Sequence, residues 1–448
     1  MTNRRSFIYP AIIATCFLYA GSVYMSQFYR LIDVCDGETV DLITSCGNYI
    51  CQALGLIAFM IGFRFLPKVF GNKRAFAVLI MVGTVFMILS QLSPNTNIII
   101  WAGYLFNIHT GLCFGFYLTQ YAAKMCPAHI AIFYGIAYSI GSLGTYLLSL
   151  PQDGEFLKST AITVLYFVLA VITAVLAILS DNIPADTDNS VDRKNVSQIS
   201  AIVIIMTIIS VNGSGLYYSL PQAADVNWNL IRCFYAAGLV LTGIVMDKDR
   251  RIGEILTAVS LVYPLIVAAL IGEGVTGTVT MGLSYLFRGC LTIYYVIFFV
   301  DLYARNSKTL FLAPLGLCLS RIVEAVLSYF MVAFQLSNLV HIIITAVFFV
   351  PLIILVIIRQ TGGPRAAAAV PDAAPVDETK RKALFAEQYS LTAREAEILD
   401  LIHEGLTDDE ISAKINISRN TVRFHVSNIL KKTGTSSRVE VSRALDKF

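Results

Sequence analysis

Long apolar runs set the strongest limit on what this chain can fold into. They follow one another from about residue 6 to residue 358, and only after residue 359 does the sequence become ordinary in polarity. Charged residues make up 14% of the 448 residues, whereas soluble domains average about 25%. A run of about 20 apolar residues crosses a bilayer as a helix. The runs are too long and continuous for the short alternating strands of a membrane β-barrel. The sequence therefore predicts an all-α polytopic membrane domain over residues 1–358.

Twelve spans are predicted, six before and six after the polar segment 181–198. The first run follows MTNRR and lacks a small-residue cleavage site, so we interpret it as a span and not as a secretion signal. The predicted spans are 7–29, 42–63, 75–93, 98–120, 130–150, 159–180, 199–220, 228–246, 253–271, 276–300, 309–335 and 339–358.

Lysine and arginine in the short loops predict the orientation, because cytoplasmic loops are enriched in both. One side of the predicted topology carries little beyond Arg30 and Lys158. The other side holds most of the loop cations: Arg64, Lys68, Lys73, Arg74, Lys124, Arg193, Lys194, Lys248, Arg250, Arg251, Arg305 and Lys308. We therefore expect that side to face the cytoplasm. Arg4 and Arg5 put the N-terminus there too, and an even number of spans returns the C-terminus to the same side. The expected location is the inner membrane of a bacterium.

Residues 359–389 predict a flexible linker rich in alanine and proline, and residues 390–448 a small soluble domain. About 20 flexible residues have a reach of roughly 25 Å. Thr392 with Glu395 and Thr407 with Glu410 form capping-box patterns, Ser418 and Ser437 are good N-caps, and Gly405 and Gly434 are good helix stops. The predicted helices are 393–404, 408–415, 419–433 and 438–446, and the second and third form a helix-turn-helix. The predicted core residues are Ile398, Leu399, Ile402, Leu406, Ile411, Ile415, Ile417, Val422, Val426, Ile429 and Val439.

The helix predicted over 419–433 has an inward face, an outward face and a flank. The inward face holds Val422, Val426 and Ile429. The outward face holds Asn420, Arg423, Phe424, Ser427 and Lys431, and the flank holds Thr421, His425, Asn428 and Lys432. Segment 419–433 contains four basic residues and no acid, whereas 393–404 carries Glu395, Glu397, Asp400 and Glu404. Basic charge gathered on one element is typical of a helix that faces phosphates, although a basic surface helix without a DNA role has the same composition.

The stretches LTAREAEILDLIHEGLTDDEIS and TVRFHVSNILKKTG closely resemble the LuxR-type (NarL/FixJ-like) DNA-binding domain over about 390–446. The resemblance implies double-stranded DNA as the partner, bound by a dimer formed through the last helix on an inverted repeat. It implies base-facing positions at Arg423, Phe424 and Ser427, and positions at or near the DNA backbone at Thr421, His425, Asn428, Lys431 and Lys432. The outward position of Asn420 on the helix and the charge of Arg419 add Asn420 to the expected base-facing residues and Arg419 to the expected backbone-facing residues. Phe424 departs from the usual polar or aliphatic residue and could touch a thymine methyl.

The six-plus-six plan resembles the major facilitator transporters. Their loop motif G-x-x-x-D-R-x-G-R-R/K is matched between spans eight and nine by GIVMDKDRR (243–251), with Arg250 where Gly is expected. Between spans two and three, RFLPKVFGNKR (64–74) has Lys68 in place of the Asp. That Asp would cap the following helix or pair with loop cations, so its loss argues against transport. A positive loop that happens to contain glycine is the alternative explanation.

Charges at mid-bilayer depth are costly and commonly functional. Arg288, Arg321 and Glu324 are such charges, and His109 lies at similar depth. Arg321 and Glu324 are three residues apart and could be a self-neutralising pair, which would leave Arg288 for a small anion such as a carboxylate. His109 is more often a packed polar residue than a ligand. Tyr134, Tyr138, Tyr235, Tyr285, Tyr294 and Tyr295 could wall such a site, although packing explains tyrosines equally well.

Other chemistries find little support. The nine cysteines form no CxxC pair and no Cys/His cluster, which predicts neither metal nor cofactor, and a disulfide between Cys35 and Cys46 stays open. No nucleophile with a base and no phosphate loop is present, so an enzyme is not expected. The favoured hypothesis is a membrane-tethered one-component transcriptional regulator whose membrane domain senses a small molecule. A transporter with a regulatory DNA-binding tail and a mere membrane anchor are the alternatives.

Overall fold

The chain divides into two compact units, Met1–Val370 and Pro371–Phe448, and each is described by itself. The computed structural model describes residues 7–150, 155–184, 193–218, 228–270, 277–361 and 382–446, except positions 306, 335, 383, 384, 387, 404, 405, 434, 436 and 437. Every element in these ranges is helical, which confirms the predicted all-α class.

The membrane unit has two halves of long helices, and eleven of its described helices are long and apolar enough to cross a membrane. The first half contains α1 (Ile8–Ile32), α2 (Gly37–Asp41), the π-helix η1 (Leu42–Gly47), α3 (Asn48–Phe65), α4 (Pro67–Phe70), α5 (Lys73–Leu92), α6 (Thr96–Lys124), α7 (Ile130–Ser149), α8 (Glu155–Lys158) and α9 (Thr160–Leu179). The second half contains α10 (Arg193–Tyr218), α11 (Trp228–Lys248), α12 (Arg250–Ser260), α13 (Tyr263–Leu270), α14 (Gly277–Arg305), η5 (Ser307–Leu312), α15 (Leu315–Phe334) and α16 (Asn338–Thr361).

The ninth predicted span is not one helix. It is broken into α12 and α13 at Leu261 and Val262, whose backbone N–H groups donate to carbonyls three residues back, on Ala258 and Val259. The cause is Pro264, which has no N–H and whose ring clashes with the carbonyl four residues earlier. The helical hydrogen bonds therefore tighten and stop before it, and neither piece alone is long enough to span.

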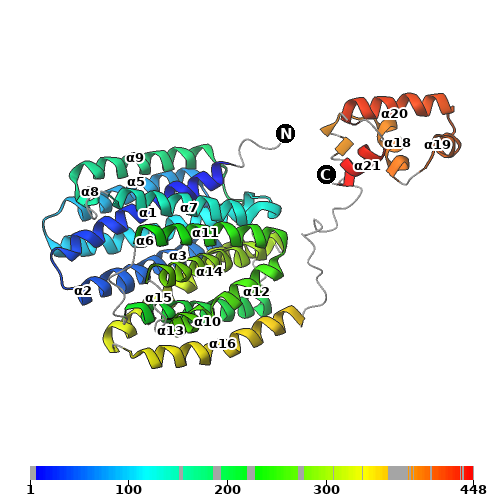
Figure 1. The fold of residues 1–448 in the computed structure, drawn as a ribbon. Coiled ribbons are helices and arrows are strands. Elements are labelled where there is room, and N and C mark those ends of the chain that lie inside the picture. The colour runs from blue at the N-terminus through cyan, green and yellow to red at the C-terminus, as the bar shows by residue number, and fades with distance from the viewer. Residues whose placement is uncertain are drawn as a thin grey trace. The chain divides into compact units, whose positions relative to one another are not determined.

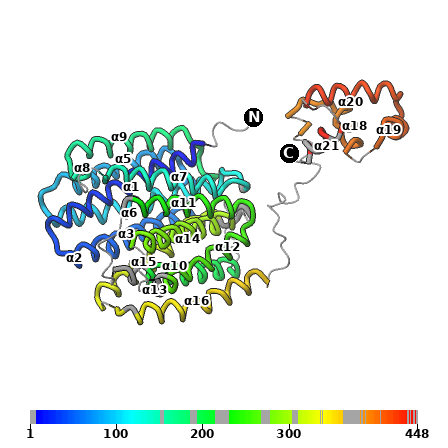
Figure 2. Tube along the Cα trace, viewed as in Figure 1, coloured from blue at the N-terminus to red at the C-terminus, as the bar shows by residue number. Residues whose placement is uncertain are grey.

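The two halves meet along α7 with α11 and along α3 with α15. Glycines permit this close approach. A Cβ added at Gly135 of α7 would lie 2.6 Å from the carbonyl oxygen of Leu239 of α11, and one at Gly243 of α11 would lie 2.9 Å from the carbonyl oxygen of Ala131 of α7. Within this unit, α1 begins and α16 ends on the same side of the bundle, whereas α2 and α8 lie on the opposite side (Figure 1). The tube view shows the same path (Figure 2).

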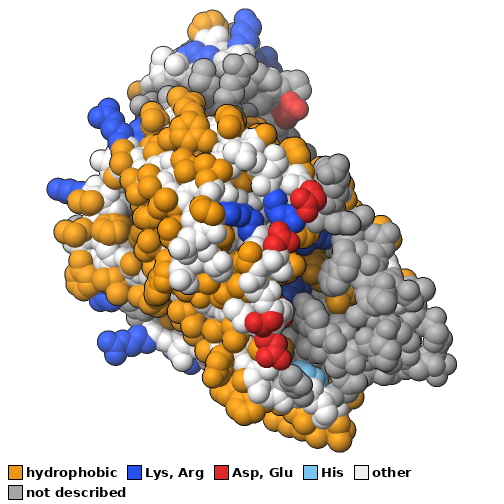
Figure 3. Space-filling view, turned by 90° about the vertical axis from the view of Figure 1, so that its left-hand side faces the viewer, with side chains coloured by type: hydrophobic (Ala, Val, Ile, Leu, Met, Phe, Trp, Pro, Cys, Tyr) orange, Lys and Arg blue, Asp and Glu red, His pale blue; other side chains and the backbone are white. Residues whose placement is uncertain are grey.

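The outer surface of the membrane unit is strongly apolar. The face that carries α2 and α8 shows a few acidic and basic side chains among broad hydrophobic areas (Figure 3). One face of α16 exposes apolar side chains at helical spacing: Leu339, Ile343, Val347, Val350, Ile354 and Ile357. An exposed apolar surface of this size fits a lipid environment and would be a liability in water.

The C-terminal unit contains α18 (Ala393–His403), α19 (Asp408–Lys414), α20 (Arg419–Thr433) and α21 (Arg438–Asp446), each within one residue of its predicted bounds. Residue 404, the predicted end of the first helix, lies outside the described residues. The core is built from Phe385, Ile398, Leu399, Leu401, Ile402, Ile411, Val422, Val426, Ile429, Val441 and Leu445. The side chain of Val439, predicted in the core, is not among those described, and Val441 and Leu445 supply the contact from α21.

Local hydrogen bonds explain where these helices begin. Thr392 and Glu395 exchange their predicted capping bonds, at 2.8 and 3.3 Å, and Thr407 and Glu410 do the same. The hydroxyl of Ser418 accepts from the N–H of Thr421 at 3.1 Å. Between α19 and α20, Asn416 has a φ of 54°, a left-handed conformation that asparagine tolerates better than most residues. The predicted signals at Gly405, Gly434 and Ser437 lie outside the described residues.

The described structure extends into the predicted linker segment from both ends. Helix α16 continues to Thr361, three residues into segment 359–389, and Phe385 is fully buried in the core of the C-terminal unit. Residues 362–381, most of that segment, lie outside the described ranges. All nine cysteines are described and are free thiols, so the disulfide considered between Cys35 and Cys46 is not formed.

Candidate functional site

Helix α20 presents one polar face and buries the other. Val422, Val426 and Ile429 are buried against the core of the unit. All four residues expected to face bases are exposed: Asn420, Arg423, Phe424 and Ser427. Phe424 is 64% exposed, which is unusual for an aromatic side chain with no partner to cover it. An exposed strip with spacing i, i+3, i+4 and i+7 is the face that a helix offers to a DNA groove.

The residues expected to face the DNA backbone divide into exposed cations and partly buried polar side chains. Arg419 and Lys431 are exposed, and Thr421, His425 and Asn428 are partly buried. Arg419 lies 3.1 Å from Asp409 of α19, and both side chains are more than half exposed. An exposed pair of this kind stabilises a protein by about 0 to 1 kcal/mol. Arg419 can therefore exchange this carboxylate for a phosphate at little cost.

Arg423 is held in place by the helix that precedes it. Its Nε lies 3.3 Å from Oδ2 of Asp408, at the first turn of α19. Asp408 also contacts the guanidinium of Arg438 at the start of α21. The side chain of Arg423 is nevertheless 58% exposed, so its remaining donors can reach a base edge. Asp408 thus orients Arg423 on the exposed face.

Lys432, which was expected to face the DNA backbone, makes contacts within the C-terminal unit. Its ammonium donates to Oε2 of Glu395 at 2.6 Å and to the carbonyl of Ser390 at 2.9 Å. The Glu395 side chain is only 4% exposed. Burial disfavours the charged carboxylate, but the hydrogen bonds from Lys432 and Thr392 outweigh this effect and hold the pKa of Glu395 below its usual value. Lys432 therefore ties α20 to α18.

In the membrane unit, three of the predicted charges form one buried cluster. Glu324 of α15 accepts from Arg321 at 2.6 Å and from Arg288 of α14 at 3.3 Å. The guanidinium of Arg321 also lies over the ring of Tyr49, 4.7 Å from its centre. The side chains of Glu324 and Arg321 are 8% and 11% exposed. The predicted Arg321–Glu324 pair is therefore present, but Arg288 is not without a partner, because the same carboxylate serves both arginines.

This sharing leaves an excess of positive charge. Two guanidinium groups face one carboxylate in the described part of the chain, so one formal positive charge remains unneutralised. The Nε of Arg321 is buried without a hydrogen-bond partner there. Arg288 keeps 31% of its side chain exposed. A buried excess cation with free donors is unfavourable by itself, and an anion with hydrogen-bond acceptors would complete the cluster.

Tyrosines line the neighbourhood of the two arginines. Tyr49, Tyr235 and Tyr285 lie near Arg288. Tyr49, Tyr138 and Tyr295 lie near Arg321. The rings of Tyr138, Tyr235 and Tyr285 follow one another edge to face, with centres 5.9 and 6.4 Å apart. The hydroxyl of Tyr134 is buried without a partner in the described chain, whereas Tyr294 belongs to another contact, with Glu254. Four of the six tyrosines considered for such a wall, Tyr138, Tyr235, Tyr285 and Tyr295, therefore lie near the two arginines.

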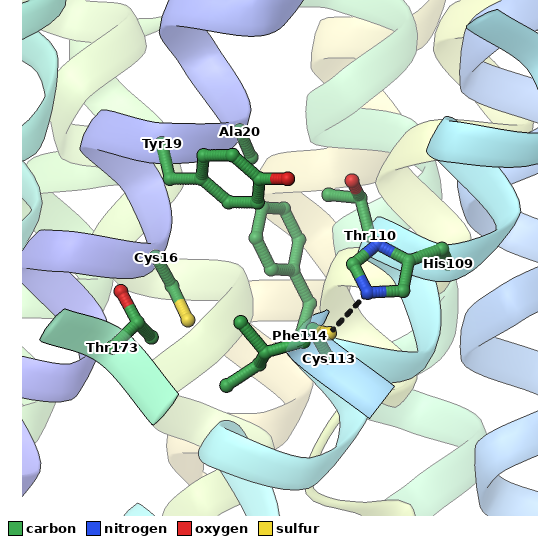
Figure 4. Close-up of a pocket in the computed structure, with 9 residues that line it drawn as sticks. Cys16, Tyr19, Ala20, His109, Thr110, Cys113, Phe114 and Thr173 are labelled. Carbon is green, nitrogen blue, oxygen red and sulfur yellow. Dashed lines mark hydrogen bonds between the residues drawn. The ribbon is translucent and has the colours of Figure 1, made fainter. Parts of the chain in front are cut away.

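His109 does not join this cluster. It lies among α1, α5, α6 and α9, where its Nε2 is 2.9 Å from the carbonyl of Leu79. A carbonyl only accepts hydrogen bonds, so Nε2 carries the proton and Nδ1 is an acceptor. Nδ1 and the hydroxyls of Tyr19 and Thr110 have no described partner, and all three residues line one small cavity (Figure 4). Its volume is about 10 Å³, which is room for one water molecule.

The two loops that resemble the major facilitator motif differ in their contacts. Asp247 accepts from the backbone N–H groups of Ala131 and Ile132, at 3.0 and 2.7 Å. It also pairs with Arg250 at 3.0 Å. The pairing was expected, but Asp247 caps α7 of the other half, and Asp249 caps the following helix, α12. The Asp therefore joins the two halves.

In the first half, the loop lacks this carboxylate and is tied down differently. The ammonium of Lys73 donates to the carbonyl of Ser180 at 2.6 Å, where α9 ends. A cation at the C-terminal end of a helix is favourable because it opposes the helix dipole. The described residues contain no group of three or more His, Cys, Asp or Glu side chains arranged to hold a metal ion.

Comparisons with known proteins agree with this geometry in the C-terminal unit. Residues 389–445 match the bacterial regulatory proteins of the luxR family. The probable transcriptional regulatory protein SgaR of Hyphomicrobium methylovorum is 49% identical over 49 residues, which is 11% of this chain and 23% of that protein. The response regulatory protein YgeK of Escherichia coli K12 is 39% identical over 70 residues, 16% of this chain and 48% of that protein. The chain thus spans less than half the length of these relatives.

The membrane unit is similar in fold to solved transporters. The structure of the major facilitator superfamily transporter FucP in the outward conformation covers 80% of this chain and 99% of its own, with a TM-score of 0.53 and 12% identity. A variant of the Escherichia coli fucose:proton symporter FucP gives the same coverage and identity and a TM-score of 0.56. The chain therefore carries a LuxR-type helix-turn-helix domain at its C-terminus, preceded by a membrane domain with a major-facilitator-like fold.

Proposed function

We propose that this protein is a membrane-tethered transcriptional regulator in which the membrane domain binds a small anion and thereby controls DNA binding by the helix-turn-helix. The observation that carries the sensing half of the proposal is the cluster of Arg288, Arg321 and Glu324, with its excess positive charge. A polytopic anchor without a ligand has no need for such a buried charge.

The DNA-binding half of the proposal rests on α20. Asn420, Arg423, Phe424 and Ser427 read base edges in the major groove, and Arg419 and Lys431 hold phosphates. Thr421, His425 and Asn428 line the flank beside the backbone. Lys432 leaves the predicted set, because it is engaged with Glu395. The domain acts as a dimer through α21 on an inverted repeat.

Signal transfer requires the anion to prefer one state of the membrane domain over another. The distribution of lysine and arginine among the loops supports a cytoplasmic position for the end of α16 and for the C-terminal unit, where DNA is available. We propose that ligand-controlled oligomerisation sets the distance between two C-terminal units. Two units on one inverted repeat bind far more tightly than one.

Genome-wide DNA occupancy of the intact protein tests the DNA-binding half. The wild type should give discrete peaks, and the double variant Arg423→Ala/Lys431→Ala, which removes one base contact and one phosphate contact, should lose them. Lys414→Ala is the matched control, since it removes an exposed cation from α19. Absence of wild-type peaks in every growth condition would refute the proposal.

The second candidate is a transporter with a regulatory DNA-binding tail. It is favoured by the fold and by the intact contact of Asp247 with the opposite half. Uptake of radiolabelled small carboxylates by proteoliposomes tests it, with Arg288→Ala as the control. Uptake that exceeds that of empty liposomes and disappears in the variant would support transport.

A further inference from the structure

The end of α16 is held by a buried carboxylate that none of the sites above uses. Glu254 of α12 is 2% exposed. It accepts hydrogen bonds from the hydroxyl of Tyr294 at 2.8 Å, from Arg359 at 2.5 Å and from Gln360 at 2.6 Å. The guanidinium of Arg359 also lies over the ring of Phe298, 4.6 Å from its centre. One carboxylate thus holds two consecutive residues of α16.

The position of this contact along the chain gives it importance. Arg359 and Gln360 lie in the last turn of α16, which ends at Thr361, and the chain continues from there to the C-terminal unit. Tyr294 and Phe298 belong to α14. The last turn of α16 is therefore fixed to α12 and α14 by charge-assisted hydrogen bonds to a buried carboxylate.

Helix α12 is linked to the contact between the two halves, which Asp247 of α11 makes by capping α7. Arg250, the first residue of α12, lies one turn before Glu254. It pairs with Asp247 at 3.0 Å and with Asp301 of α14 at 2.5 Å. Helix α12 has 11 residues and is followed by a break. A series of contacts therefore runs from the start of α7 through Asp247 and Arg250 to the helix that carries Glu254.

We propose that the contact of Glu254 with Arg359 and Gln360, called the clamp below, transmits the conformational state of the membrane domain to the end of α16. From there the chain continues to the C-terminal unit. When α7 separates from Asp247, α12 shifts, the clamp loosens, and the last turn of α16 is released. Glu254 is a positioning residue in this account and touches neither ligand nor DNA. The inference rests on the proposed function only for the use that the C-terminal unit makes of the release.

Hydrogen exchange of the full-length protein in lipid nanodiscs, followed by mass spectrometry, tests the clamp. In Glu254→Gln, amides of residues 358–361 should exchange about tenfold faster than in the wild type. The matched control is Asp33→Asn, which removes an exposed ion pair with Lys158 and should leave this segment unchanged. Unchanged protection in Glu254→Gln would overturn the clamp, and so would an equal rise across α12, α14 and α15, because that pattern means a general loss of packing.

Transmission from the other half has its own test. Asp247→Asn should raise exchange in the same segment, because it weakens both the cap on α7 and the ion pair with Arg250 of α12. Protection equal to the wild type would overturn the transmission. These exchange results do not depend on transcription, so a protein with a working clamp but no DNA occupancy would refute the proposed function and leave the clamp standing.

Discussion

Arg321 in the membrane unit and Arg423 in the DNA-binding unit are both paired with a carboxylate, yet the two pairs differ in kind. Arg321 is 11% exposed and lies 2.6 Å from a carboxylate that is 8% exposed. Arg423 is 58% exposed and lies 3.3 Å from its partner. Burial keeps water from the first pair, whereas solvent reaches the guanidinium of the second. The pair of Arg321 is therefore fixed within the structure, and Arg423 keeps donors that can reach DNA while Asp408 orients it.

The same contrast separates two ways of binding an anion. The central cluster would attract a ligand because two cations share one carboxylate, so the ligand adds a partner without displacing one. Helix α20 would attract DNA phosphates by exchanging exposed carboxylate partners for them. The first mode is insensitive to salt, and the second weakens as salt rises.

The largest expected effect follows from removing the shared carboxylate. Glu324→Gln leaves two buried guanidinium groups without a counter-charge, so we expect the membrane unit to lose about 3 to 5 kcal/mol of stability. Asp409→Asn, which removes the exposed partner of Arg419, should change stability by less than about 1 kcal/mol. Thermal unfolding in nanodiscs measures the loss of stability in each variant. Equal losses in the two variants would contradict the distinction between the buried and the exposed pair.

Arg423→Ala should come next in size. Losing a guanidinium at a base edge costs about 1 to 3 kcal/mol of specific binding and relaxes preference at that base pair. Phe424→Ala should lower preference for thymine at a neighbouring position. Fluorescence anisotropy with DNA duplexes taken from occupancy peaks measures both. If Arg423→Ala weakens all duplexes alike, Arg423 is a phosphate contact and not a base contact.

Lys432→Ala should act on stability and on its pH dependence. The folded pKa of Glu395 is lowered, so this group contributes stability that is present above its unfolded pKa of about 4.3 and is lost as the pH falls through the folded pKa. Removing Lys432 should cost on the order of 1 kcal/mol at neutral pH, since the lysine is partly exposed, and should flatten the acid dependence. The free energy of unfolding of the C-terminal unit, measured between pH 7 and pH 3, tests both expectations. An unchanged pH profile would mean that Lys432 does not stabilise the charged carboxylate.

The smallest effect is expected for Lys431→Ala. It should weaken binding to all duplexes similarly and reduce the slope of log K against log salt by about 1, because one phosphate contact is lost. Lys432→Ala should leave that slope unchanged. A reversed result would return Lys432 to the DNA-facing set.

Local signals explain what could be predicted from the sequence. The bounds of α20 and the capping pairs of Thr392 and Thr407 follow from residues within one turn of each other, and the spans follow from apolar length alone. The break between α12 and α13 at Leu261 also has a local signal, which is Pro264. The continuous apolar run around Pro264 favoured a single span instead. Such features are local in the chain.

Tertiary partners could not be predicted in this way. Lys432 looks like a phosphate contact until Glu395, 37 residues away, is placed beside it. Asp247 caps a helix that begins 117 positions earlier, and Glu254 meets Arg359 at a separation of 105. Arg288 finds its carboxylate 36 residues on, in a neighbouring helix. Each of these contacts depends on how helices pack, about which residue spacing says nothing.

The most direct test of sensing coupled to DNA binding is genome-wide occupancy of the intact protein in cells grown on a panel of small carboxylates. We expect wild-type peaks whose height changes with at least one carboxylate, peaks of constant height in Arg288→Ala, and none in Arg423→Ala/Lys431→Ala. Wild-type peaks that stay constant on every carboxylate, or an Arg288→Ala variant that follows the wild type, would contradict the account.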